Sequence, residues 1–426
     1  MNVRRVDVVV IGGGPAGSAA ASVLARAGRR VVLFEKETFP RYHIGESLIP
    51  FCYFPLERMG ALEKMKASSY QKKLSVQFVS TNGEVSTPFY FFQHMDHECT
   101  NTWQVLRSDF DMMLLNHARE MGAEVHEATP VKEILWSDDR ATGVRAFGPG
   151  GETHVVEAPV TIDCSGRDAL SMSRLKWRRF DPWLNKVAVW TYFEDAVRDP
   201  GVDEGATTVA YIPDKGWFWY IPLDRKLTSV GVVADGSYLF RDTRDLAAIL
   251  AREVRQNRWI EEHLAPGRQV DTYRATQEYT YRSQHCAIDG LVLAGDAFAF
   301  LDPIFSSGVF LALQGGVLAA DAAQAAIEKG DTSAVQFTEY GRKMVSGIEA
   351  MRSLVYAFYD KKFSFRTLFE KRPELRGPVT DCLIGNLFID FEEIWKKARD
   401  FARLPEPLPQ GTPFVKPQPV ASPHSA

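Results

Sequence analysis

The chain of 426 residues is 45% hydrophobic and 24% charged and carries a formal net charge of −4, so it is long and apolar enough to bury a large core. The charge gives no electrostatic basis for binding nucleic acid or an anionic membrane surface. The five scattered cysteines form no C-x-x-C pair, which indicates free, mostly buried thiols of a cytoplasmic protein rather than disulfides or a metal site. No run of about 20 uninterrupted apolar residues occurs, so no transmembrane segment is predicted.

The N-terminal residues predict a βαβ unit. The β-branched run 6–11 is typical of a parallel strand that is buried on both faces. Glycines interrupt this apolar run directly, so a buried strand fits it better than an export signal does. The Ala-rich stretch 16–27 predicts a helix that ends at Gly28, and 30–35 predicts a second strand.

A glycine motif lies where the first strand meets the helix. Gly12, Gly14 and Gly17 form G-x-G-x-x-G, a spacing that permits a tight turn, a close approach of a pyrophosphate and packing of the helix on the strand. The N-terminus of the helix favours the phosphates. Glu35 ends the second strand, where its carboxylate can accept hydrogen bonds from ribose hydroxyls. The pattern predicts a dinucleotide site.

The remaining elements predict a second sheet and a helical C-terminus. Residues 76–105 and 185–235 alternate apolar and polar positions and are rich in aromatics, which predicts a largely antiparallel sheet. A buried strand is predicted at 291–293 and a long helix at 309–328, and residues 338–403 look helical.

Two further strand ends indicate that the dinucleotide is FAD. Residues 293–297 read Leu-Ala-Gly-Asp-Ala, and a strand that ends in Gly-Asp places the carboxylate of Asp296 near the ribityl hydroxyls of a flavin. Residues 163–166, Asp-Cys-Ser-Gly, form a second turn of the same kind. The sequence holds one dinucleotide fingerprint, so no second Rossmann domain for NAD(P)H is predicted.

The predicted fold class is α/β: a Rossmann-type FAD-binding lobe with an inserted, largely antiparallel β-sheet substrate lobe and a helical C-terminal region. The predicted divisions are an FAD-binding lobe of residues 1–75, 100–180 and 275–335, a substrate lobe of 76–99 and 181–274, a helical region of 336–403 and a tail of 404–426. The tail carries seven prolines and no apolar period, so it is expected to be extended or disordered.

A series of motifs in this order resembles the flavin monooxygenases of the p-hydroxybenzoate hydroxylase fold across residues 3 to 335. After the glycine motif come Gly45-Glu46-Ser47-Leu48, Arg107 ahead of Phe110-Asp111, Asp163-x-Ser165-Gly166, Gly295-Asp296-Ala297 and Asp302-Pro303-x-x-Ser306-Ser307-Gly308. The segment 217–222, Trp-Phe-Trp-Tyr-Ile-Pro, fits the W-x-W-x-I-P pattern of the flavin-dependent halogenases. The chain therefore resembles that family.

The resemblance implies an FAD site and a mechanism. The residues it implies for FAD are Gly12, Gly14, Ala16, Gly17, Glu35, Lys36, Arg107, Asp296 and Gly308. A separate NAD(P)H-flavin reductase would supply FADH2, and O2 would form a flavin hydroperoxide that oxidises chloride or bromide to hypohalous acid. An aromatic ring would then be halogenated with the help of an active-site lysine.

The resemblance implies Lys73 as that lysine, although Ser75-Val76 stands where similar halogenases have Gly-Ala. Lys72 is the neighbouring alternative. If both lie on a strand, their side chains point to opposite faces, and only one can serve the site.

The halide site and the wall of the active site are implied in the same way. Backbone N–H groups of Ser307 and Gly308 would hold the halide. The residues of the wall that would separate flavin from substrate are Trp217, Trp219, Ile221, Pro222 and Phe305. Tryptophan halogenases carry a glutamate where this chain has Phe305, so the sequence looks closer to halogenases of phenols and pyrroles, the latter bound to an acyl or peptidyl carrier protein.

Two other functions remain open at this point. One is an aromatic hydroxylase in which the substrate attacks the flavin hydroperoxide directly, and the other is a non-catalytic FAD-binding protein whose tail and helices serve a partner. Halide-dependent product formation separates the first from a halogenase. The ring that is modified, the choice between chloride and bromide, the general base and the oligomeric state do not follow from the sequence.

Overall fold

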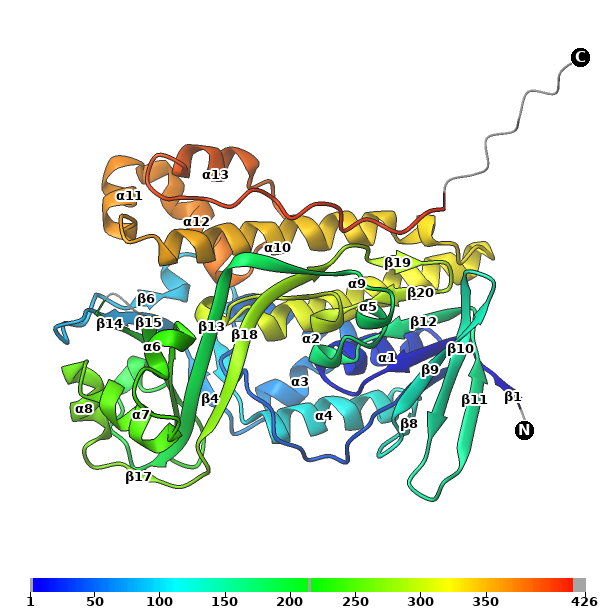
Figure 1. Ribbon diagram of the computed structural model, residues 1–426, viewed down its shortest axis with the longest axis horizontal. Coiled ribbons are helices and arrows are strands. Elements are labelled where there is room, and N and C mark those ends of the chain that lie inside the picture. The colour runs from blue at the N-terminus through cyan, green and yellow to red at the C-terminus, as the bar shows by residue number, and fades with distance from the viewer. Residues whose placement is uncertain (1–2, 214–215, 417–426) are drawn as a thin grey trace, which may run out of the picture.

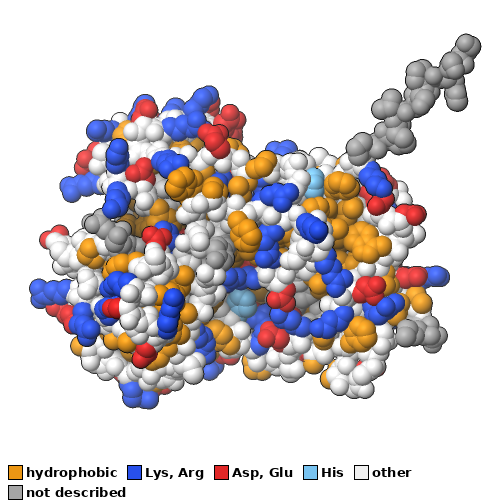
Figure 2. Space-filling view, viewed as in Figure 1, with side chains coloured by type: hydrophobic (Ala, Val, Ile, Leu, Met, Phe, Trp, Pro, Cys, Tyr) orange, Lys and Arg blue, Asp and Glu red, His pale blue; other side chains and the backbone are white. Residues whose placement is uncertain are grey.

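The computed structural model describes residues 3–213 and 216–416. Two lobes lie side by side under a long C-terminal helix (Figure 1). Charged side chains of both signs are interspersed over the face shown in Figure 2.

The FAD-binding lobe is built on a mainly parallel sheet in the order β19-β20-β12-β2-β3-β8. Its strands are β2 (Val8–Ile11), β3 (Val31–Phe34), β8 (Glu124–His126), β12 (Val160–Asp163), β19 (Ala287–Ile288) and β20 (Leu291–Leu293). The central strand β2 is buried throughout and pairs in parallel with β12 and β3, as its β-branched sequence predicts. A second, smaller sheet flanks it, formed by β1 (Val3–Arg5), β9 (Val131–Ser137), β10 (Arg140–Phe147) and β11 (Thr153–Glu157).

Helices cover this sheet. They include α1 (Pro15–Arg26), α2 (Tyr53–Met59), α3 (Leu62–Lys66), α4 (Arg107–Glu120), α5 (Leu170–Arg174) and α9 (Gly308–Lys329). Helix α9 is long and apolar enough to span a membrane by length and composition alone, but 56% of that window is buried inside the fold. A Cβ added at Gly316 would lie 2.2 Å from the carbonyl oxygen of Ala16 in α1. Such close packing is that of a core helix.

The substrate lobe is a large, mostly antiparallel sheet in the order β21-β18-β13-β16-β15-β14-β5-β6. Its strands are β5 (Ser75–Val79), β6 (Phe89–Tyr90), β13 (Arg178–Glu194), β14 (Thr207–Ile212), β15 (Gly216–Pro222), β16 (Leu227–Ala234), β17 (Arg268–Gln269), β18 (Arg274–Ser283) and β21 (Ala299–Phe300). Helices α6 (Gly236–Leu239), α7 (Leu246–Val254) and α8 (Arg258–Leu264) pack on it, and β4 (Gln71–Lys73) and β7 (Thr102–Gln104) form a separate ladder.

The boundary between the lobes differs from the predicted one. Residues 275–283 were expected in the FAD-binding lobe, but they belong to β18 and pair along β13 in the large sheet. The long strands β13 and β18 run from one lobe to the other (Figure 1). A 10-residue strand cannot leave its partner midway without losing ladder hydrogen bonds, so the pairing sets the boundary.

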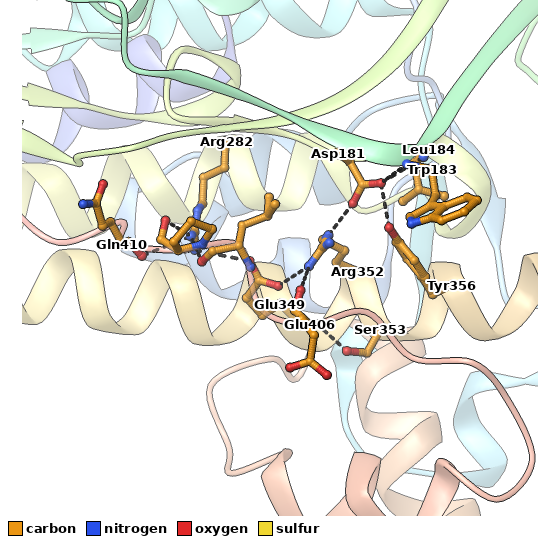
Figure 3. Close-up of polar contacts among 12 residues, drawn as sticks. Asp181, Trp183, Leu184, Arg282, Glu349, Arg352, Ser353, Tyr356, Glu406 and Gln410 are labelled. Atoms are coloured by element: carbon orange, nitrogen blue, oxygen red, sulfur yellow. Dashed lines mark hydrogen bonds and ion pairs between the residues drawn. The ribbon is translucent and has the colours of Figure 1, made fainter.

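The C-terminal region consists of α10 (Thr338–Tyr359), α11 (Phe365–Lys371), α12 (Arg376–Ile384) and α13 (Glu392–Ala398), as predicted from composition. Residues 404–416 of the tail are extended and ordered against the fold rather than disordered. The guanidinium of Arg282 donates to the carbonyl groups of Leu408, Pro409 and Gln410 (Figure 3). Residues 417–426 lie outside the described part of the chain.

A buried ion-pair network anchors α10 beside this tail. Arg352 donates to Asp181 at 2.6 Å, to Glu349 at 2.7 Å and to the carbonyl oxygen of Glu406 at 2.9 Å (Figure 3). Tyr356 donates to the same Asp181 carboxylate at 2.7 Å. The charges are buried together with their partners, so these charge-assisted hydrogen bonds are strong. They hold the tail in place, although its proline-rich sequence does not predict an ordered segment.

Candidate functional site

A cavity of about 490 Å³ opens between the two lobes. Its walls come from the glycine loop, residues 41–47, the start of α4, the loop after β20 and strands β13 to β15. Eight of the nine residues predicted to bind FAD line it, and Gly17 does not; the eight are Gly12, Gly14, Ala16, Glu35, Lys36, Arg107, Asp296 and Gly308.

Each of the three motif glycines is required for a different structural reason. Gly12 has φ +98°, and a Cβ there would lie 2.3 Å from the carbonyl oxygen of Cys164. A Cβ at Gly17 would lie 1.9 Å from the carbonyl oxygen of Gly12, so this glycine lets α1 pack on the turn. A Cβ at Gly14 would meet only Arg41, at 3.5 Å. Space is therefore open at Gly14, as a pyrophosphate requires.

The acidic residue that ends β3 lies at the cavity. The Glu35 carboxylate accepts hydrogen bonds from the backbone N–H groups of Gly13 at 2.6 Å and Glu37 at 2.8 Å. Neighbouring Lys36 pairs with Asp168 at 2.5 Å across the cavity rim. Both side chains are placed where the prediction requires, and their contacts with a ribose stay a prediction.

Arg107 holds the loop that carries the Gly-Glu-Ser motif. Its guanidinium pairs with Asp111 at 2.8 Å and 2.9 Å and donates to the carbonyl oxygen of Ile44 at 2.6 Å. Gly45 adopts φ +104°, which favours glycine at this turn. Arg107 therefore positions Glu46 and the residues around it, in addition to lining the cavity.

Asp296 faces the cavity from the turn after β20. Burial raises the pKa of its carboxyl to about 6, while the charges of Arg167 and Arg107 lower it. Its carboxylate accepts no hydrogen bond from residues 3–213 and 216–416, so its acceptor capacity is free. A buried acceptor of this kind fits the hydroxyls of a ribityl chain.

The predicted halide loop begins α9. Ser306 has φ +55° and turns the chain, and within the described chain the N–H groups of Ser307 and Gly308 meet no protein acceptor. Gly308 lines the cavity, whereas Ser307, 1% exposed, does not. Free N–H groups at the start of a helix suit an anion.

The aromatic wall is partly as predicted. Trp217, Trp219 and Ile221 are buried and line the cavity, but Pro222 and Phe305 do not. Phe305 instead packs edge-on against Phe358 of α10, with ring centroids 5.7 Å apart. Strand alternation turns the side chain of Pro222 away from the face that Trp217, Trp219 and Ile221 present.

A tyrosine that the sequence did not indicate ties this wall to the halide loop. Trp217 donates its indole N–H to the Tyr359 hydroxyl at 2.9 Å, and Tyr359 donates to Asp302 at 2.9 Å. Burial raises the pKa of the Asp302 carboxyl to about 6, and hydrogen bonds from Ile304 and Tyr359 lower it. Tyr359 ends α10 and belongs to no motif, so only the fold reveals it.

Lys73 is buried, at 1% exposed, and does not itself line the cavity but hydrogen-bonds a residue that does. Its Nζ donates to Ser47 Oγ at 2.8 Å and to the carbonyl oxygen of Leu48 at 3.0 Å. Ser47 lines the cavity and also bonds Thr207 at 2.8 Å. Burial lowers the pKa of Lys73 to about 7. Lys72 is exposed and lies over the ring of Trp103, so the two lysines do point to opposite faces of β4.

The features of the cavity fit FAD as its ligand. Gly14 leaves space for a pyrophosphate, Glu35 and Asp296 supply carboxylate acceptors, and a helix N-terminus lies beside each predicted anionic group. The cavity also extends past this region to the tryptophan wall, which leaves room for a second, apolar ligand.

Comparison with known proteins agrees with this geometry. A sequence profile of the tryptophan halogenase family matches residues 93–369, and one of FAD dependent oxidoreductases matches residues 7–174. The chain is 30% identical over 410 residues to the 1H-pyrrole-2-carbonyl-(peptidyl-carrier protein) chlorinase of Pseudomonas fluorescens, with 91% of each chain covered. It is 38% identical over 344 residues to the flavin-dependent halogenase armH3 of Armillaria mellea, with 75% of this chain and 68% of that one covered.

Solved structures agree as well. The flavin-dependent brominase Bmp2 has a TM-score of 0.84 and 27% identity, covering 93% of this chain and 98% of that chain. The predicted fold class, the use of FAD and the enzyme class are confirmed by these matches. The chain belongs to the flavin-dependent halogenases and is an FAD-dependent oxidoreductase.

Proposed function

We propose that this halogenase installs chlorine or bromine on a pyrrole or phenol ring that a carrier protein presents. The observation that carries the proposal is the buried Lys73 beside a cavity with an aromatic wall, in a chain whose full-length relative is named a chlorinase of a carrier-bound pyrrole. The five free, buried cysteines are consistent with work in the cytoplasm.

The chemistry that FAD supplies when bound in reduced form is the activation of O2 by which a halide is oxidised to hypohalous acid. A separate reductase would provide the reduced flavin, because the sequence has a single dinucleotide fingerprint. The N–H groups of Ser307 and Gly308 would hold the halide, and Trp217 and Trp219 would keep bulk water and the ring away from the flavin side.

Lys73 would transfer the halogen to the ring. As an ammonium it can hydrogen-bond and polarise hypohalous acid. As a neutral amine it can take up the halogen with release of water, and the resulting N–halogen group can pass the halogen to the ring and regain the ring proton. A pKa of about 7 makes both states available near neutral pH. Either route requires the hydrogen bond between Lys73 and Ser47 to open, because that contact separates the amine from the cavity.

The test is mass spectrometry of products from enzyme, reductase, FAD, O2 and chloride or bromide. The ring compounds offered are a pyrrole on a carrier protein, the same pyrrole free, and free phenols. Halogenation of the carrier-bound pyrrole alone supports the full proposal, and halogenation of free phenol overturns the carrier requirement. A hydroxylated product without halide dependence would establish the hydroxylase alternative.

Substitutions test the role of Lys73. Lys73→Ala and Lys73→Arg should lose halogenation while FAD affinity stays unchanged, since an arginine remains charged and is longer and planar. Lys72→Ala is the matched control and should stay active, because its side chain lies on the exposed face of β4. An active Lys73→Ala protein would remove the lysine from the mechanism.

A further inference from the structure

Glu46 presents a buried carboxyl group to the cavity that no motif role explains. The residue is 1% exposed, it lines the cavity next to Trp190 and Trp219, and its Oε2 has no hydrogen-bond partner in the described part of the chain. A buried carboxyl group with one unpartnered oxygen lowers the free energy of unfolding, so its presence here calls for a functional explanation. Arg107 holds the turn on which it sits, through the carbonyl oxygens of Ile44 and Gly45.

A chain of hydroxyl groups connects this carboxyl with the protein surface. The Tyr192 hydroxyl donates to Glu46 Oε1 at 2.6 Å, and the hydroxyl oxygens of Tyr192 and Tyr42 are 3.2 Å apart. Tyr42 is 42% exposed. Trp190 donates its indole N–H to the Tyr42 oxygen at 2.6 Å. Tyr192 has a single hydroxyl proton, and when it donates this proton to Glu46, Tyr42 can donate its own to the Tyr192 oxygen. In this arrangement both hydroxyl protons point from the surface toward the cavity.

The reaction needs such a path. Reduced FAD, O2, one halide ion, the ring compound and one proton become oxidised FAD, the halogenated ring and two water molecules. The ring proton ends in water together with the oxygen that left the hypohalous acid. One further proton must therefore enter the cavity from solvent in each turnover, even while the aromatic wall excludes water.

We propose that Tyr42, Tyr192 and Glu46 form a relay that delivers this proton from solvent to the cavity. Glu46 gives its proton to the other oxygen atom of O2, the one that does not enter the hypohalous acid, and this oxygen leaves as water. Tyr192 then reprotonates the Glu46 carboxylate, Tyr42 reprotonates Tyr192, and solvent reprotonates Tyr42. The inference rests on the proposed reaction for its need of a proton. The relay itself is a property of this chain and can be measured without turnover.

The charges around Glu46 allow it to hold and release a proton near neutral pH. Burial raises the pKa of its carboxyl to about 7, while the hydrogen bond from Tyr192, the nearby Ser229 hydroxyl and the charges of Arg107 and Arg274 lower it. The relevant side chains therefore come from β13, β16, α4 and β18. Burial also raises the pKa values of Tyr42 and Tyr192, so both stay neutral donors in this range.

The first experiment is an infrared pH titration of the FAD-free protein from pH 5 to 9. A carboxylic acid C=O band with its midpoint near pH 7 should disappear in Glu46→Gln and shift in Tyr192→Phe, which removes the hydrogen bond but keeps the ring. The buried carboxyls of Asp296 and Asp302 also titrate in this range, with midpoints near pH 6, and their bands should remain in both variants. The matched control is Tyr238→Phe, because Tyr238 donates to the buried Glu253 at 2.8 Å on the far helices of the same lobe. This control should leave the band unchanged. If the band with its midpoint near pH 7 persists in Glu46→Gln, the assignment to Glu46 is wrong.

The second experiment measures halogenation against pH with reduced FAD supplied in excess. Glu46→Gln should lower turnover about 100-fold and Tyr192→Phe and Tyr42→Phe about 10-fold, within the range of general acid catalysis, while FAD affinity stays unchanged. Since Lys73 also titrates near pH 7, the fall of the wild-type rate above this pH is assigned to Glu46 only if it vanishes in Glu46→Gln. Wild-type turnover in both tyrosine variants would overturn the relay.

The two experiments separate the relay from the proposed substrate. If the wild type halogenates none of the offered rings but the Glu46 band titrates and responds to Tyr192→Phe, the proposed substrate is wrong and the relay stands. If the wild type halogenates but neither the band nor the pH profile responds to these substitutions, the relay is wrong and the proposed function stands.

Discussion

Replacing Lys73 with methionine should stabilise the protein while abolishing halogenation. Lys73 is 1% exposed, and its ammonium donates hydrogen bonds to two neutral groups, Ser47 Oγ and the Leu48 carbonyl oxygen. No carboxylate is among its hydrogen-bond or ion-pair partners in the described chain. Burial lowers the pKa of Lys73 from 10.5 to about 7. The charge therefore opposes folding.

The sign and size of the effect on the free energy of unfolding follow from proton linkage. The unfolded chain binds the lysine proton up to pH 10.5, whereas the folded chain releases it above about pH 7. Between these values the unfolded state holds more protons, so wild-type stability rises by about 1.4 kcal/mol per pH unit. Below about pH 7 both states are protonated and folding bears the whole cost, on the order of 5 kcal/mol.

Methionine removes this cost but also loses two hydrogen bonds, at about 1 kcal/mol each. We expect Lys73→Met to be more stable than wild type by roughly 2–3 kcal/mol at pH 7, and this advantage to shrink by about 1.4 kcal/mol for each pH unit above it. The assay is urea unfolding of FAD-free protein at pH 7, 8 and 9. Lys72→Met is the control and should show a much smaller pH effect, because Lys72 is exposed. A difference between Lys73→Met and wild type that does not change with pH would refute the reasoning.

Three other predictions concern the proposed FAD site, the source of reduced flavin and the buried ion pairs of α10. Gly14→Val should fold, because an added Cβ meets only Arg41 at 3.5 Å, but its side chain would occupy the pyrophosphate's place and weaken FAD binding at least about 100-fold in a fluorescence titration; unchanged affinity would contradict the site. The purified protein given NADH and FAD should reduce flavin no faster than a blank, and rapid NADH oxidation would show that it needs no reductase. Arg352→Met should cost about 3–5 kcal/mol of unfolding free energy because Asp181 is left buried without its cation, whereas Arg366→Met at an exposed pair should cost less than about 1 kcal/mol.

Local sequence pattern was enough to predict the elements around the proposed cofactor site. The β-branched run of β2 predicted a strand that is buried on both faces, and the glycine spacing predicted a turn that the backbone approaches closely. Both features depend on the residue itself and its immediate chain neighbours. The period of two along a strand predicted that Lys72 and Lys73 point to opposite faces, whereas the choice of Lys73 as the buried, active-site residue came from the resemblance to the family.

Contacts between distant segments were decided only by the tertiary structure. Pattern alone grouped Pro222 and Phe305 with the cavity wall, but packing turned them away from it. The proline-rich tail has no period, yet Arg352 donates to its backbone at Glu406 and Arg282 at residues 408–410. These outcomes depend on which surfaces meet when the lobes and helices pack.

The site chemistry shows the same division. Glu46 and Tyr192 are 146 positions apart, and neither residue type nor spacing indicates that they share a hydrogen bond. Their pKa values depend on burial, which arises because β13 packs against the loop around Gly45 that Arg107 holds. The sequence by itself determined the glycine turn that is predicted to bind FAD, because the spacing of glycines along the backbone makes that turn. The fold decided which side chains could serve the proposed transfers of a proton and a halogen, because their pKa values are set by neighbours from distant parts of the chain.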